Sequence, residues 1–141
     1  MKIAIINGPN LNMLGKREPE IYGSTSLDEA MQGLKNRYPE LEFTFLQSNI
    51  EGELIDYIQQ VGFDHDGIIL NAGAYTHTSV GIGDAVSAVS ADVIEVHISN
   101  TYSREEFRHQ SFISPNAKGV ILGFGIQSYT LAVSSFLLRG E

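Results

Sequence analysis

The chain has 141 residues, of which 43% are hydrophobic and 18% are charged, as expected for one globular domain over residues 1–141 and not for a disordered chain. Its formal net charge of -8 argues against nucleic acid and anionic membranes as partners, because both favour clustered Lys and Arg. The absence of cysteine excludes disulfides and thiolate metal sites.

Short apolar runs alternate with segments of helical period along the chain. In chain order the pattern predicts a strand at 2–6, a helix at 26–39, a strand at 42–48, a helix at 53–62, a strand at 67–71, a helix at 78–89, strands at 93–99 and 119–125, and a helix at 128–138. Ser26 and Glu29 have the spacing of a capping box at the start of the first helix. This alternation predicts an α/β fold of flavodoxin-like order, with a five-stranded parallel sheet and helices on both faces.

The first ten residues contain an apolar run that is too short for the core of a signal peptide. No other run approaches the length of a membrane span. We therefore expect a cytoplasmic protein with no membrane partner.

Small and polar residues follow most of the predicted strands. Ligands of parallel sheets bind at the carboxyl ends of the strands, so these residues are expected to form a polar, amide-rich pocket at one edge. The residues concerned are Asn7, Gly8, Pro9 and Asn10, then Asn71, Gly73, Tyr75 and His77, then Glu95, His97, Ser99 and Asn100, and finally Gly123, Gly125 and Gln127.

Several familiar chemistries fit this pocket poorly. Six residues separate Gly8 from Gly15, so the segment is not a phosphate-binding P-loop, and residues 123–128 resemble only half of a dinucleotide fingerprint. Glu95 and His97 share one face of a strand, but no pair of histidines has the helical spacing of a metal site, so a metal is disfavoured. No lysine lies in an apolar segment suited to Schiff-base chemistry. For His97 the competing interpretation is an ordinary core histidine.

Acid–base chemistry remains, and residues 7–23 offer an unusual pair for it. Arg17 and Tyr22 lie five apart in a stretch rich in Gly, Pro and Asn. An arginine near a tyrosine favours the phenolate, which can act as a base. The competing interpretation is an exposed surface loop with an ordinary arginine and tyrosine.

Four motifs together resemble the type II 3-dehydroquinate dehydratases of the shikimate and quinate pathways. They are NGPNLNMLGKREPEIYG at 7–23, NAGAYTHTS at 71–79, EVHISN at 95–100 and FRHQS at 107–111. The resemblance covers nearly the whole chain and implies a flavodoxin-like lyase that removes water from 3-dehydroquinate with no cofactor and no metal. It also implies a homo-oligomer, a dodecamer of trimers.

The resemblance implies a role for each matching residue. Tyr22 would be the base, Arg17 would lower its pKa, Asn10 would hold a water at the enolate oxygen, and His97, with Glu95 beside it, would protonate the leaving hydroxyl. The substrate-binding residues would be Asn71, His77 and Arg108 for the hydroxyls, the amides of Ile98 and Ser99 for the carboxylate, and Asp84 from an adjacent subunit. The stretch 7–23 would then be a lid that excludes water.

The chain departs from this family at VGIGDAV, residues 80–86, where many members have an arginine just before the aspartate. Gly81 and Gly83 each weaken a helix by up to about 1 kcal/mol relative to alanine. This puts the subunit contact made by the segment in doubt.

Two other functions stay open on the residues alone. A flavodoxin-like domain could bind a nucleotide or a flavin, in which case the purified protein would be yellow or would bind flavin tightly. A receiver-type regulatory domain would need acidic residues after the first and third strands, and asparagines stand there instead.

Overall fold

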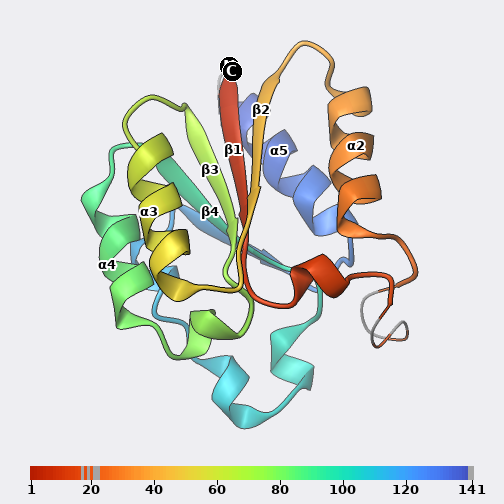
Figure 1. Ribbon diagram of the computed structural model, residues 1–141, viewed down its shortest axis with the longest axis vertical. Helices are drawn as coiled ribbons and strands as arrows, with labels where there is room; N and C mark the ends of the chain where they lie inside the picture. Colours follow the sequence, from red (N-terminus) through yellow and green to blue (C-terminus); the bar gives the residue numbers. More distant parts are fainter. Residues whose placement is uncertain (17, 19, 21–22, 140–141) are drawn as a thin grey trace.

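The computed structural model describes residues 1–16, 18, 20 and 23–139 (Figure 1). Its sheet has five parallel strands in the order β2-β1-β3-β4-β5. The strands are β1 (Lys2–Asn7), β2 (Glu42–Gln47), β3 (Gly67–Asn71), β4 (Asp92–His97) and β5 (Gly119–Leu122). This order is the flavodoxin-like one, so the predicted fold class is confirmed.

In the part of the chain that the structure describes, four helices cover both faces of the sheet, as predicted. Helices α2 (Leu27–Arg37) and α5 (Gln127–Arg139) pack on one face, and α3 (Glu51–Val61) and α4 (Val80–Ala88) pack on the other (Figure 1). Side chains of β1 alternate between the two resulting cores, with Ile3 and Ile5 in the first and Ala4 and Ile6 in the second. A strand covered on both faces must be apolar throughout, which explains why β1 and β3 are continuous apolar runs.

The start of α2 confirms the predicted cap. The Ser26 hydroxyl oxygen accepts a hydrogen bond from the backbone N–H of Glu29 at 3.1 Å, and Ser26 also donates to the Glu29 carboxylate. Such caps satisfy N–H groups that the first helical turn leaves without partners.

Three predicted strands extend too far, and the one at 42–48 does so by a single residue, since β2 ends at Gln47. β5 ends at Leu122 and not at 125, because Gly123 and Gly125 have φ angles of 93° and 64°, which belong to a turn and not to a strand. β4 ends at His97 and not at 99. Local propensity also failed to predict the 3-10 helices, which are η1 (Leu11–Met13), η2 (Gly73–His77), η3 (Thr101–Ser103), η4 (Glu106–His109) and η5 (Ser114–Asn116).

No helix in the described part of the chain combines the length and apolar character that crossing a bilayer requires.

The two glycines of α4 have different environments. A Cβ atom on Gly83 would lie 2.3 Å from the carbonyl oxygen of Phe112, whereas one on Gly81 would meet only side-chain atoms, Ile55 Cδ1 at 3.2 Å and Ser79 Oγ at 3.8 Å. Gly83 therefore permits a close backbone approach between α4 and the segment that follows η4. This packing role was missed when both glycines were interpreted only as weakening the helix.

Gly83→Ala is expected to lower the free energy of unfolding by about 1–3 kcal/mol, because a backbone carbonyl must move to accommodate the methyl group. Gly81→Ala is the matched control, and its gain in helix propensity of up to about 1 kcal/mol should leave stability equal or higher. Urea unfolding followed by circular dichroism measures both. Equal stability of the two variants would contradict the close approach at Gly83.

Candidate active site

A cavity of about 170 Å³ lies at the carboxyl ends of the strands, where the sequence predicts a pocket. Its walls come from the loop after β1, from β3 and η2, from the end of β4, and from the segment holding η3 and η4. The lining residues are Pro9, Asn10, Leu11, Met13, Leu14, Asn71, Gly73, Ala74, His77, His97, Ile98, Ser99, Thr101, Arg104 and Arg108.

The cavity brings together most of the predicted site residues. Seven of them line it, namely Asn10, Asn71, His77, His97, Ile98, Ser99 and Arg108. Glu95 lies behind His97 and contacts it. Asp84 is exposed on α4 and does not line the cavity of its own chain. Arg17 and Tyr22, the predicted base and its partner, lie outside the described residues.

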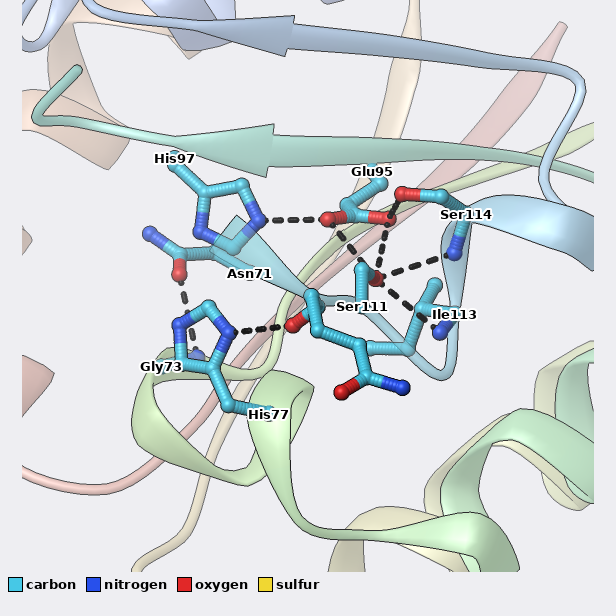
Figure 2. A network of polar contacts seen from close by, with 9 residues as sticks. Asn71, Gly73, His77, Glu95, His97, Ser111, Ile113 and Ser114 are labelled. Atoms are coloured by element: carbon cyan, nitrogen blue, oxygen red, sulfur yellow. Dashed lines mark hydrogen bonds and ion pairs between the residues drawn. The ribbon is translucent and has the colours of Figure 1, made fainter. Parts of the chain in front are cut away.

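Glu95 and His97 form a buried, hydrogen-bonded pair on β4. They are two residues apart on one strand, so their side chains share a face as predicted. His97 Nε2 lies 2.5 Å from Glu95 Oε2, and the two residues are only 7% and 2% exposed (Figure 2). His97 is therefore a core histidine whose hydrogen bond is satisfied, yet its ring also forms part of the cavity wall.

The surroundings of Glu95 favour its ionised form. Burial raises the pKa of this carboxyl, but the hydrogen bonds from His97 and Ser114, the charge of His97 and the hydrogen bond from Ser111 together outweigh burial. The net effect lowers the pKa below its ordinary value. Because an ionised carboxylate only accepts hydrogen bonds, His97 donates its Nε2 proton to Glu95, and Nδ1 is the ring nitrogen left for other chemistry.

His77 has the opposite tendency and favours its neutral form. Burial lowers its pKa, and the positive charges of His97 and Arg108 add to this effect against the hydrogen bond to the Gln110 carbonyl. That carbonyl accepts a hydrogen bond from the Nδ1–H group at 2.7 Å, so the neutral ring keeps a lone pair on Nε2. A lone pair on the wall of a cavity can accept a hydrogen bond from a ligand hydroxyl.

A buried tyrosine fixes the orientation of Asn71. The Tyr129 hydroxyl on α5 donates to Asn7 Oδ1 at 2.5 Å and accepts from Asn71 Nδ2 at 2.9 Å. Asn71 Oδ1 in turn accepts from the backbone N–H of Gly73. Burial raises the pKa of Tyr129 despite the Asn71 contact, so the hydroxyl stays protonated and keeps donating to Asn7. The second Nδ2 proton of Asn71 is free of these contacts and available to a ligand.

Arg108 brings positive charge to the cavity wall. Its side chain is only 20% exposed, and its Nε donates to Glu105 at 2.5 Å. Its guanidinium also stacks 4.9 Å above the Phe107 ring. A guanidinium held in this way presents its remaining N–H donors in a fixed orientation.

Sequence reasoning missed several residues of the site. Arg104 and Thr101 line the cavity, and the spacing of Arg104 four residues before Arg108 was a signal that both cations belong to one segment. Ser111 was quoted within a motif but was given no role, and Ser114 was not considered. Tyr129 carried no local signal, because its partners lie 58 and 122 residues away along the chain.

Within the described ranges, no group of three or more His, Cys, Asp or Glu side chains is arranged to hold a metal ion. The sequence suggested one candidate metal cluster, formed by His77, His97 and Glu95. In the structure His77 is hydrogen-bonded to the Gln110 carbonyl, and His97 and Glu95 are hydrogen-bonded to each other.

Comparison with known proteins decides the family. The family model of the class II dehydroquinases matches residues 1–137 of the sequence. The chain belongs to the class II dehydroquinase family. The predicted resemblance is thereby confirmed.

Named dehydroquinases are similar to the chain over nearly all of their length. A protein of Exiguobacterium sp. named 3-dehydroquinate dehydratase is 55% identical over 97% of this chain and 94% of its own. A protein of the same name from Chlorobaculum tepidum is 51% identical over 99% and 95%. The crystal structure of type II dehydroquinase from Butyrivibrio crossotus superposes with a TM-score of 0.93 at 46% identity, covering 96% of this chain and 97% of that one. Such dehydratases are hydro-lyases, so the predicted enzyme class is confirmed.

Proposed function

We propose that this dehydroquinase eliminates water from 3-dehydroquinate to give 3-dehydroshikimate, and that it does so through an enolate. The observation that carries the mechanism is the group of side chains on one wall of the cavity. His97, which is hydrogen-bonded to the buried Glu95, lines this wall together with His77, which favours its neutral form, and Arg108, which is paired with Glu105. The names of its relatives supply the substrate.

Tyr22 is the base in this mechanism. The C–H bond beside the ketone breaks, its proton passes to the Tyr22 phenolate, and the electron pair forms the enolate. Such a proton is only weakly acidic, so the developing negative charge must be stabilised in the same step. Arg17 supplies positive charge for this, and Asn10, which lines the cavity, holds a water against the enolate oxygen.

His97 is the acid of the second step. The enolate expels the hydroxyl group, and this group leaves as water with a proton from the imidazolium form of His97. Before this transfer, the positive charge of the imidazolium lies against the Glu95 carboxylate, whose lowered pKa keeps it a hydrogen-bond acceptor. A histidine suits this transfer at neutral pH.

The remaining wall residues bind and orient the substrate. Asn71 donates its second Nδ2 proton to a substrate hydroxyl, His77 accepts at Nε2, and Arg108 donates from its guanidinium. The backbone amides of Ile98 and Ser99, at the end of β4, bind the carboxylate.

The same family membership supports a cytoplasmic homo-oligomer, a dodecamer of trimers, that acts in the shikimate pathway. Asp84 is exposed on α4, so its side chain is available to the active site of an adjacent subunit.

The direct test adds 3-dehydroquinate to the purified protein, with a chelator present, and follows the ultraviolet absorbance of the conjugated enone product. Turnover with chelator is the expected result. No absorbance change at any protein concentration would overturn the proposed function. Absorbance that appears only after a divalent metal is restored would overturn the metal-free mechanism alone.

A further inference from the structure

Two serines contact the Glu95 carboxylate in addition to His97 (Figure 2). Ser111 Oγ lies 3.0 Å from Glu95 Oε1 and 3.2 Å from Oε2, and Ser114 Oγ lies 2.6 Å from Oε1. We propose that Ser111 and Ser114 are positioning residues of the active site: they hold the Glu95 carboxylate as an acceptor for His97, and they dock the segment that carries Arg108 against β4.

The protons of Ser111 can be assigned by counting its partners. Its oxygen accepts hydrogen bonds from the backbone N–H groups of Ile113 and Ser114, both at 3.0 Å. These two bonds occupy both lone pairs, so the one hydroxyl proton of Ser111 has only the carboxylate as its partner among these contacts. The direction of the Ser111–Glu95 hydrogen bond is therefore fixed by the turn that follows Ser111.

This arrangement sets the proton position on His97. A buried carboxyl with fewer donors would take up a proton more readily, since burial disfavours its charge. A protonated Glu95 could donate to Nε2 of His97, and the ring would then carry its proton on Nδ1 in the neutral state. With Ser111 and Ser114 donating, Glu95 remains an acceptor and the Nε2 proton stays between the two residues.

The groups that could alter the charge of Glu95 come from three elements. His97 on β4 contacts it directly, whereas His77 on η2 and the two cations Arg104 and Arg108, from the segment that holds η3 and η4, share the cavity. The neighbours of Glu95 in the register of the sheet carry no charge; they are Leu70 on β3 and Val120 on β5. Ser111 and Ser114 are thus the hydroxyl donors on which the ionised form depends.

The same serines tie the arginine-bearing segment to the sheet. Between Arg108 and Ser114, the Gln110 carbonyl accepts a hydrogen bond from His77, and the Phe112 N–H donates to the Thr76 carbonyl at 3.0 Å. Contacts to β4 and to η2 therefore alternate along the segment. The acid pair and the hydroxyl-binding arginine are in this way parts of one hydrogen-bonded unit.

Ser114→Ala is the sharper test, because the described contacts of its hydroxyl consist of one hydrogen bond to Glu95, while Ser111 also caps a turn. The Glu95 carboxyl can be titrated by carbon-13 NMR, with its signal assigned by Glu95→Gln. We expect the midpoint to rise by about one pH unit in Ser114→Ala, as loss of a hydrogen bond to a charged group implies. Ser114→Thr, which keeps the hydroxyl, should restore it.

The kinetic consequence rests on the proposed function. In Ser114→Ala we expect kcat to fall about ten-fold with little change in KM. We also expect the acidic limb of the kcat–pH profile to shift to higher pH, because the pKa of Glu95 is raised. Ser90→Ala is the matched control, because the Ser90 hydroxyl also makes one hydrogen bond, to the Gly62 carbonyl. Ser90 precedes β4 and so lies at the amino edge of the sheet, whereas the cavity lies at the carboxyl edge.

The two measurements separate the possible failures. An unchanged Glu95 midpoint in both Ser114→Ala and Ser111→Ala would overturn the positioning role. A fall in activity that Ser114→Thr does not restore, with the midpoint unchanged, would also overturn it. A chain with no dehydratase activity would defeat the proposed function, while the NMR titration would still decide whether the serines hold the carboxylate.

Discussion

Replacing His97 with alanine is expected to lower kcat for dehydration of 3-dehydroquinate by roughly 10²–10⁴-fold, the usual contribution of a positioned acid. The reason is that the leaving hydroxyl loses its proton donor, while Glu95 remains as a buried carboxylate with its two serine donors. Steady-state rates from the enone absorbance give the effect. Removal of the proton beside the ketone should be impaired less, which deuterium exchange into 3-dehydroquinate measures.

His65→Ala is the matched control for this variant. His65 is also hydrogen-bonded to a carboxylate, Asp64, at 2.6 Å, but it precedes β3 and so lies at the amino edge of the sheet, away from the cavity. Its loss should leave kcat within about two-fold. If His97→Ala slowed exchange and dehydration equally, a separate acid step at His97 would be ruled out.

Tyr22→Phe is expected to nearly abolish both exchange and dehydration, because the phenolic oxygen that takes the proton in the first step is removed. The expected loss is at least as large as the roughly 10²–10⁴-fold of a general base. Circular dichroism and urea unfolding should show a folded protein of ordinary stability. Retention of more than about a tenth of the original rate would defeat the assignment of Tyr22 as the base.

Tyr38→Phe provides the tyrosine control. The Tyr38 hydroxyl pairs with Ser134 at 3.1 Å, next to the start of β2 and away from the cavity. Its removal should affect stability and leave turnover nearly unchanged. Together the variants divide the reaction, since loss of exchange marks the base and loss of dehydration alone marks the acid.

The sequence predicted the fold well because each of its signals is local. Apolar runs bounded by turn residues identified the strands, and the capping pair Ser26 and Glu29 identified the start of a helix. The alternation of these elements then allowed few topologies other than a parallel sheet. The strand ends at His97 and Leu122 were less predictable, because they depend on turn geometry that apolar patterning does not encode.

The site was predictable to a different extent. Residues at the carboxyl ends of strands, such as Asn71 and His97, could be placed together from topology alone. The roles of Tyr129, Ser114 and Gly83 could not, because each depends on a contact made by residues distant in sequence. Gly83 shows the difference most clearly. Its low helix propensity can be read from the sequence, but the close approach of the Phe112 carbonyl oxygen, which only a residue without a side chain permits, cannot.

The hydrogen bonds of Tyr129 have a consequence for the order of assembly. They join the last helix that the structure describes to the first strand and, through Asn71, to the floor of the cavity. A chain emerging from the ribosome can pair β1 with β3 long before α5 exists, but Asn71 then has no tyrosine to orient it. Competence to bind substrate should therefore be the final property that the nascent enzyme acquires, later than its sheet.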